Sequence, residues 1–224
     1  MKAKRKEAIF AYIILAPTLI FIFVFMLGPM IQSAYYSFFK WNLLGDINFV
    51  GLKNYKYLFV DDLSFKKVIL NTVIYTLFNM GGTLVLAMVS ALMLQSDGKI
   101  VRWVRSAVFI PVVVPMAVMG IVWNMMYEPQ YGVINQALGV IGVPPQQWLF
   151  KSNTAMFSVI LFNIWKEFGL YMIIIVGALQ RVPRELYESA SLDGAGYFRT
   201  FFKITLPSIK PIFFFVTTIL MINS

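Results

Sequence analysis

The sequence predicts an all-α protein that crosses a membrane several times. Hydrophobic residues make up 59% of its 224 residues and charged residues only 13%, whereas a soluble domain has about 25% charged residues. Several apolar stretches approach the roughly 20 residues that one helix needs to span a bilayer. Basic residues gather in alternate connecting segments, which is typical of the cytoplasmic loops of membrane proteins.

The alternation of apolar and polar segments predicts five spans and a cytoplasmic N-terminus. We expect a cytoplasmic tail at 1–7, a first span at 8–30 and an external segment at 31–67. The core, 68–224, then holds spans at about 68–94, 107–127, 155–179 and 208–224. Twelve basic residues lie on the resulting cytoplasmic side and six outside, although five of those six lie within the external segment.

The two ends of this topology need separate arguments. A basic tail and an apolar stretch also begin cleaved signal peptides, but here the apolar stretch is too long and no small-residue cleavage site follows it. The last apolar stretch ends at Asn223 and Ser224 and is barely of span length. We therefore expect an uncleaved first span and an incomplete last one.

Two pairs of residues inside the spans predict local shape. Pro111 and Pro115 lie one helical turn apart in the third span, where their missing N–H groups should bend or loosen the helix. Gly81 and Gly82 lie in the second span. Small residues let two membrane helices approach closely, so we favour packing over a hinge for this pair.

The composition argues against catalysis by the chain itself. Cysteine and histidine are absent, which excludes disulfides and thiol chemistry and removes the commonest general base and metal ligand. Only Glu167 among the ten acidic residues lies deep in a span, so no carboxylate pair is evident. No glycine-rich phosphate loop ending in Gly-Lys-Ser or Gly-Lys-Thr occurs. We expect no catalytic residue, metal or cofactor site, and the net charge of +9 follows the membrane topology rather than a nucleic-acid-binding face.

A polar stretch between the last two spans, which we call the elbow (184–207), predicts two short helices. The first helix is expected at Arg184–Leu192, with Gly194 ending it in the left-handed conformation. The second is expected at 196–203, and Pro207 should stop it. Such a segment is either an amphipathic loop in the lipid interface or an element that docks into a partner protein.

The spacing of residues in the elbow favours docking. It resembles the cytoplasmic signature of ABC importer permeases, which reads Glu-Ala-Ala, three residues, Gly, nine residues and Ile-x-Leu-Pro. The matching positions, with two neighbours that also match, are Glu188, Ser189, Ala190, Asp193, Gly194, Ala195, Ile204, Leu206 and Pro207. Ser189 departs from the pattern, but it replaces one small residue with another.

From about Gly51 to its end the chain is similar to carbohydrate-uptake permeases of the maltose type, which belong to binding-protein-dependent transport systems. The resemblance implies the helix bundle of a type I ABC importer in a bacterial or archaeal plasma (inner) membrane, surrounded by lipid. It also implies a second permease subunit, two ATPase subunits that bind ATP and magnesium, and an extracytoplasmic solute-binding protein. The elbow would dock into the ATPase and move as a lever.

The same resemblance suggests a substrate path. Lys166, Glu167 and Leu170 in the fourth span, and Ile222 and Asn223 in the fifth, fall where maltose-type permeases contact sugar. The two charged residues depart from the maltose protein, which implies a more polar or charged substrate. From the residues alone, either a polar path or a charge neutralised against another helix remains open, and snorkelling of Lys166 is a further alternative.

A second class of function would use the same acid differently. An ion-coupled secondary transporter could bind a proton or cation at Glu167. Such carriers are built from paired repeats, which this sequence lacks, and they need no docking element. The elbow therefore favours the ATP-driven importer, and sugar as the substrate is an inference from the family.

Overall fold

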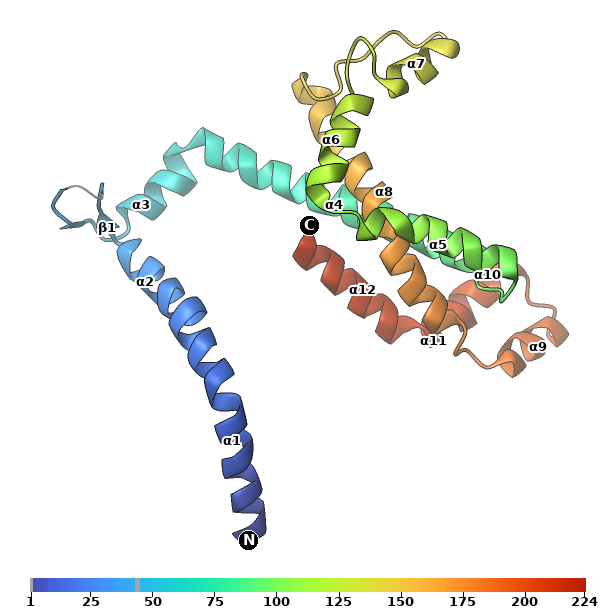
Figure 1. The fold of residues 1–224 in the computed structure, drawn as a ribbon, viewed down its shortest axis with the longest axis horizontal. Coiled ribbons are helices and arrows are strands. Elements are labelled where there is room, and N and C mark those ends of the chain that lie inside the picture. The colour runs from blue at the N-terminus through green and yellow to red at the C-terminus, as the bar shows by residue number, and fades with distance from the viewer. Residues whose placement is uncertain (1, 43–44) are drawn as a thin grey trace. The chain divides into compact units, whose positions relative to one another are not determined.

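The computed structural model describes residues 2–42 and 45–224, and helices dominate it (Figure 1). The chain divides into two compact units, 1–70 and 71–224. The elements of the first unit are α1 (Lys2–Ile22), a π-helical turn η1 (Phe23–Leu27), α2 (Gly28–Tyr36), strands β1 (Phe39–Lys40) and β2 (Asn48–Phe49), α3 (Lys53–Lys56) and a second π-helical turn η2 (Tyr57–Asp61).

Helix α4 (Leu63–Met93) begins in the first unit and forms the first element of the second. The second unit continues with α5 (Lys99–Val113), α6 (Met116–Met126), α7 (Val133–Val140), α8 (Ser152–Leu179), α9 (Arg184–Leu192), α10 (Tyr197–Thr200), a third π-helical turn η3 (Phe201–Thr205), α11 (Leu206–Ser208) and α12 (Lys210–Asn223).

The first unit is one long helical segment followed by a small hairpin. Its apolar part runs over Phe10–Tyr36, so the helix continues past residue 30, where the predicted span ended. The helix ends at Tyr36, and tyrosines suit the membrane–water interface. Beyond it, β1 pairs antiparallel with β2, and the Asn54 amide donates to the Ser37 and Phe39 carbonyls at 2.8 and 3.0 Å.

Helix α8 is the centre of the second unit. Both α5 and α12 pack against it, and Met172 and Ile175 in its C-terminal half are completely buried. Helices α8 and α5 come close together at Gly169, where an added Cβ would overlap the Val108 carbonyl oxygen of α5. A glycine here lets two helix backbones meet, as small residues do in membrane bundles.

The span predicted at 107–127 is not a straight helix, because α5 and α6 meet within it at an angle of 98°. The break falls at Val114 and Pro115, which both have extended backbone angles. Proline cannot donate to the preceding turn and disfavours the helical conformation of the residue before it. The predicted bend is confirmed at Pro115, whereas Pro111 is accommodated within α5.

Within residues 2–42 and 45–224, three helices are long and apolar enough to cross a bilayer. The number rises to five if each of two bent pairs counts as one span. The second bent pair joins Tyr197–Ser208 to Lys210–Asn223 at 75°.

Candidate docking and transport sites

Helix α9, the first part of the elbow, occupies the predicted range Arg184–Leu192. Its end is also as predicted, because Gly194 has a φ of 69°. The chain reverses there through hydrogen bonds from the Gly194 N–H to the Ser191 carbonyl (3.1 Å) and from the Ala195 N–H to the Ala190 carbonyl (2.9 Å). This pairing satisfies carbonyls that a helix end leaves open, and glycine enters the left-handed region without a steric penalty.

The second part of the elbow differs from the prediction. It is helical from Tyr197 to Ser208, and Pro207 does not stop it. The π-helical turn η3 lies directly before the proline, with the Leu206 N–H bonded to the Phe201 carbonyl. A wider turn leaves room for a residue that lacks an N–H and would crowd the preceding turn of a regular α-helix. The change of direction comes two residues later, at Ile209.

The two parts of the elbow are tied together by a buried seam. The hydroxyls of Tyr187 in α9 and Thr205 in η3 lie 3.2 Å apart and share a hydrogen bond. Ala190 on the same side of α9 is buried, and Leu206 packs against the main core. Ile204 is partly buried. Three of the nine signature residues therefore face inward and fix the shape of the elbow.

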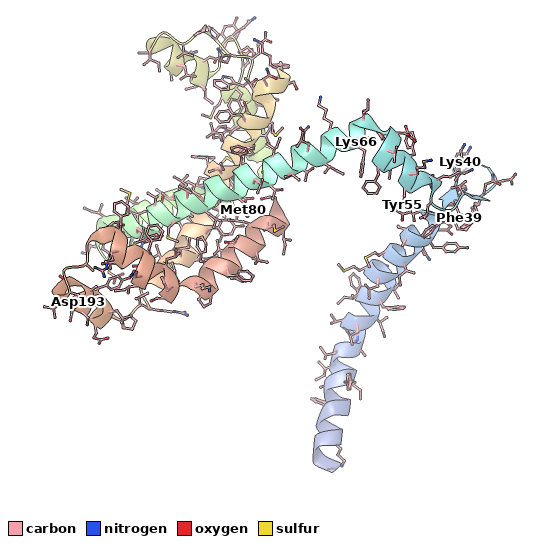
Figure 2. The ribbon with its side chains drawn as sticks, turned by 180° about the vertical axis from the view of Figure 1, so that it is seen from behind. Phe39, Lys40, Tyr55, Lys66, Met80 and Asp193 are labelled. Atoms are coloured by element: carbon pink, nitrogen blue, oxygen red, sulfur yellow. The ribbon has the colours of Figure 1, made fainter. Side chains whose placement is uncertain are left out.

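The remaining charged signature residues face outward. Glu188 and Asp193 are exposed, and Figure 2 shows Asp193 at the outer tip of the elbow. Ser189 is exposed too, and its hydroxyl donates to the Glu185 carbonyl at 2.8 Å. Leu192 was not predicted as part of the docking surface, and its side chain is 90% exposed beside Asp193. Its position directly before the Asp-Gly turn was the available signal.

The loop between α4 and α5 lies at the same end of the second unit as the elbow. The Gln180 side chain, at the end of α8, donates to the Gln95 carbonyl at 3.2 Å and to the Asp97 carboxylate at 3.1 Å. Helix α7 lies at the opposite end of this unit (Figure 1). There the Trp148 indole donates to the Asn135 side chain at 2.8 Å, so the loop after α7 is ordered by a buried amide.

The predicted substrate-path residues are partly brought together. Lys166 and Glu167 are half-buried in α8, and Glu167 interacts electrostatically with Tyr75 of α4 and Tyr171 of α8. The Tyr171 side chain lies close to that of Asn223 of α12. A carboxylate, two phenols and an amide from three helices therefore gather at membrane depth.

Two further path candidates lie on the surface of the unit rather than in this cluster. Leu170 is 37% exposed and Ile222 is 73% exposed. Both are apolar and could line a path only beside the polar cluster.

A second polar network, centred on buried asparagines, was not predicted. The Asn163 amide of α8 donates to the Asn79 side chain of α4 at 3.2 Å. Asn79 in turn donates to the Ser224 hydroxyl, after α12, at 2.9 Å. The network joins three helices through groups that are costly to leave unpaired in hydrocarbon. The presence of two asparagines within apolar stretches was the available signal for such a network.

Comparison with protein families gives one match that covers most of the core. Residues 83–224 match the family described as "Binding-protein-dependent transport system inner membrane component". The chain is 33% identical to the probable ABC transporter permease protein YurN of Bacillus subtilis, over 94% of this chain and 73% of that protein. It is 33% identical to the sulfoquinovosyl glycerol transport system permease SmoG of Agrobacterium fabrum, over 92% of this chain and 67% of that protein.

A solved structure agrees with these sequence relatives. A chain of the bacterial alginate ABC transporter, crystallised with an alginate pentasaccharide-bound periplasmic protein, superposes with a TM-score of 0.79. The identity is 26%, and the match covers 98% of this chain and 74% of that one. Permeases of this family are membrane subunits and not catalysts, and the match does not favour an ion-coupled carrier. The chain belongs to the inner-membrane components of binding-protein-dependent transport systems, the permease subunits of ABC importers.

Proposed function

We propose that this permease forms half of the translocation path of a carbohydrate importer and docks its ATPase through the elbow. The observation that carries the proposal is the construction of the elbow. Tyr187 and Leu206 pack against the main core and Ala190 is buried, while Glu188 and Asp193 face outward. A rigid projection of this kind can transmit a push from a partner to the spans.

Docking would use the exposed tip of the elbow. Leu192 offers an apolar side chain that would otherwise face water, and a groove that buries it would gain about 1.5–3 kcal/mol. Glu188 and Asp193 flank it and would set the orientation through charged partners at the rim. This is the helix-in-groove mode of recognition, with α9 as the helix.

The substrate path would pass the polar cluster around Glu167. Carboxylate, phenol and amide groups can accept hydrogen bonds from sugar hydroxyls, and Tyr171 and Asn223 can also donate. Lys166, half-buried beside Glu167, would suit an acidic substituent on the sugar. The relatives named for sulfoquinovosyl glycerol and alginate support a carbohydrate. Leu170 and Ile222 would form apolar walls of the path.

The complete importer would contain further chains. We infer a second permease, two ATPase subunits that bind ATP and magnesium, and a solute-binding protein outside the membrane. The end of the unit that carries the elbow would then be cytoplasmic, together with the tail at 1–7. The loop ordered by Asn135 and Trp148 would face the binding protein.

The proposal is tested by substitution in the elbow of the assembled transporter. Gly194→Val forces a β-branched side chain into a φ of 69° and should abolish ATP-dependent uptake in proteoliposomes, with membrane insertion retained. Gly196→Val is the matched control, because Gly196 has a negative φ and nothing lies within 4 Å of its added Cβ. Uptake by the Gly194→Val transporter at the level of the control would contradict the docking role.

The energy source is tested on the same proteoliposomes. Uptake should require ATP on the side of the membrane that carries the ATPase subunits. It should persist when ion gradients across the membrane are collapsed. Uptake that follows an ion gradient and is lost in Glu167→Gln would instead establish a gradient-driven carrier.

A further inference from the structure

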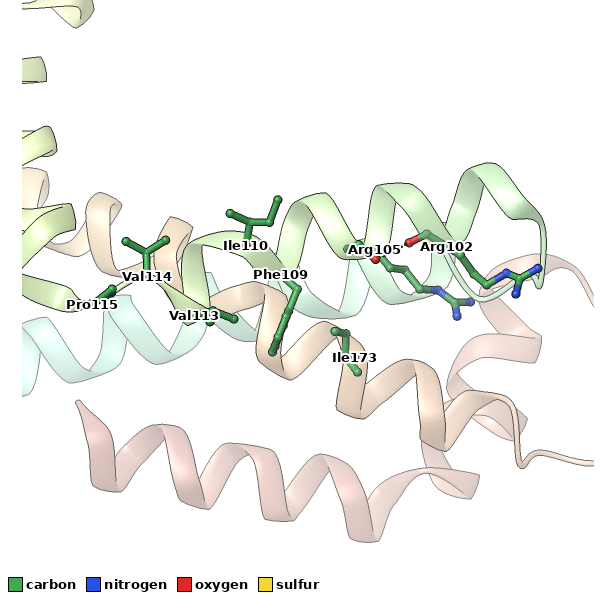
Figure 3. Close-up of a pocket in the computed structure, with 9 residues that line it drawn as sticks. Arg102, Arg105, Phe109, Ile110, Val113, Val114, Pro115 and Ile173 are labelled. Carbon is green, nitrogen blue, oxygen red and sulfur yellow. Dashed lines mark hydrogen bonds between the residues drawn. The ribbon is translucent and has the colours of Figure 1, made fainter.

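The second unit has an apolar groove of about 770 Å³ along α5 (Figure 3). It ends at the helix break of Val114 and Pro115, and Ile173 of α8 also lines it. Lys166, Leu170 and Ile173 share one side of α8, because they recur at intervals of four and three residues. The groove therefore belongs to the side of the substrate path proposed above. The proposed function gives no such role to an apolar surface on the external segment of the first unit.

This second apolar surface lies on the helical segment that α3 and η2 form together. Leu52, at the start of the segment, is 67% exposed, and Phe59 and Val60 are exposed to a similar extent. Seven residues, about two helical turns, separate Leu52 from Phe59, which places the two side chains on one side of the segment. Asn54 and Tyr55 between them are half-buried. The segment is therefore amphipathic, and its apolar side is open.

Hydrogen bonds hold the other side of the segment against the end of the first span. The Asn54 amide donates to the Ser37 and Phe39 carbonyls, and the hydroxyls of Tyr55 and Ser37 lie 2.6 Å apart. Ser37 directly follows Tyr36, the last residue of the apolar helical segment Phe10–Tyr36. The start of α3 is thus fixed at the level where the chain leaves the membrane.

The far end of the segment leads directly into the next span. The apolar helix Leu63–Met93 begins two residues after η2 ends at Asp61. The Asp62 carboxylate accepts the N–H groups of Ser64 and Phe65 at 2.8 and 3.1 Å, and it thereby caps α4. Consecutive spans cross a bilayer in opposite directions, so the segment between them begins and ends at the same membrane surface. The segment therefore lies along that surface.

Aromatic rings mark the same level. The ring centroids of Tyr35 and Phe39 lie 4.9 Å apart, and those of Tyr36 and Trp41 lie 5.4 Å apart. Tyrosine and tryptophan are enriched where a membrane meets water, because each ring has an apolar body and one polar end. The hairpin to which α3 is bonded therefore lies at headgroup level rather than clear of the membrane.

The lysines of the external segment suit the same position. Lys53 and Lys56 are exposed on α3, and Lys40 is exposed in β1. Residues 31–67 hold five lysines and three acids, an excess of positive charge that is unusual in an external loop. A lysine can rest its stem on apolar surface while its ammonium group reaches the phosphates. Contact with lipid headgroups would give this excess a role.

We propose that α3 and η2 form an interfacial element that lies in the headgroup region of the membrane. Leu52 and Phe59 enter the boundary of the acyl chains, and Lys53 and Lys56 contact lipid phosphates, with a preference for anionic lipids. Amphipathic helices with lysines on the polar side bind lipid surfaces in this way. The element thereby fixes the depth at which α4 enters the bilayer. The inference requires only that both spans cross the membrane, and it is independent of the transported substrate and of the elbow.

The test measures the depth of single spin labels in the assembled transporter, reconstituted in phosphatidylglycerol and phosphatidylcholine. This chain has no cysteine, so Leu52→Cys, Phe59→Cys and Asp61→Cys each provide one label when the partner subunits are also free of cysteine. All three side chains are exposed. Labels at Leu52 and Phe59 should collide more often with oxygen, which concentrates in lipid, than with a water-soluble nickel chelate. The label at Asp61, the control on the same segment, should show the reverse.

Each of three other results would overturn the proposal. A preference for the nickel chelate at Leu52 and Phe59 would place the apolar surface in water. Labels shielded from both reagents would show that protein covers the surface. Labels that become shielded only when the loaded solute-binding protein is added would make the surface a docking site for that protein.

The role of the lysines is tested with a fluorescent label at Phe59→Cys, which brominated phospholipids quench on contact. Brominated phosphatidylglycerol should quench this label more than brominated phosphatidylcholine at the same mole fraction. Lys53→Gln and Lys56→Gln should each reduce that preference about fivefold, since one lysine near a membrane surface contributes about 1 kcal/mol. Lys151→Gln, before α8, removes a positive charge outside the segment and is the control. An unchanged preference in both lysine variants would overturn the proposed contact with lipid phosphates.

Discussion

The segment Phe10–Tyr36 and helix α8 are both apolar enough to span a membrane, yet they differ in how much of their surface the rest of the protein buries. The first has a mean hydropathy of 2.6, and none of its most apolar window is buried. The second has a mean hydropathy of 1.8, and 44% of its window is buried. Lipid tails are as apolar as leucine, so apolar surface alone does not drive helices together, whereas small and polar residues favour contact between helices.

Matched isoleucines test this contrast most directly. Ile175→Ala in α8 removes a completely buried side chain and should lower the free energy of unfolding by about 3 kcal/mol. Ile20→Ala in α1 changes a side chain that is 62% exposed and should cost less than about 0.5 kcal/mol. Unfolding of the purified protein in mixed micelles with increasing denaturing detergent measures both. Equal losses would contradict the contrast between the two segments.

Two glycines of α8 extend the test to the backbone. Gly169→Ala places a Cβ against the Val108 carbonyl of α5 and should cost about 2 kcal/mol, because backbone atoms cannot move aside easily. Gly177→Ala, two turns later in the same helix, meets nothing within 4 Å and should be neutral or slightly stabilising. The same unfolding assay applies, and a harmless Gly169→Ala would show that α5 and α8 are not in close contact.

The buried amides should contribute less than the packing. Asn79→Leu removes the bonds to Asn163 and Ser224 and should cost about 1 kcal/mol, since hydrogen bonds between membrane helices average about 0.6 kcal/mol each. A double-mutant cycle with Asn163→Leu isolates the pair. A coupling energy of zero would mean that the two side chains act independently.

The smallest effect is expected at Thr83. Its hydroxyl is fully buried in α4 and has no hydrogen-bond partner in the part of the chain that the structure describes. Thr83→Val keeps the shape and removes the unpaired oxygen, so stability should change by less than about 0.5 kcal/mol or rise. A clear loss of stability, measured in the same way, would show that the hydroxyl has a partner in the assembled protein.

Local chemistry explains why part of the structure could be predicted from the sequence. The bounds of α9 and the left-handed turn at Gly194 follow from residues next to each other in the chain. The break at Pro115 was expected as a bend, but its angle of 98° depends on what α5 and α6 pack against. Pro207 was misjudged because the π-helical turn before it has no sequence signature.

The candidate sites divide in the same way. The signature in the elbow was recognisable from its spacing, but the inward direction of Ala190 and Leu206 required the fold. Of the two adjacent glycines in α4, a Cβ added at Gly82 would meet Ile164, as expected for close packing. Nothing lies within 4 Å of a Cβ added at Gly81. Asn79, Asn163 and Ser224 are far apart in sequence, so no local pattern indicated that they form one network.

The bend between α5 and α6 also constrains how the protein is made. These helices have 15 and 11 residues, whereas an independent span needs about 20. The backbone groups freed at Val114 and Pro115 must be shielded from hydrocarbon by protein or water. Helix α8, against which α5 packs, follows later in the chain. The segment is therefore expected to leave the insertion machinery before its support exists and to reach its final depth only once α8 has entered the bilayer.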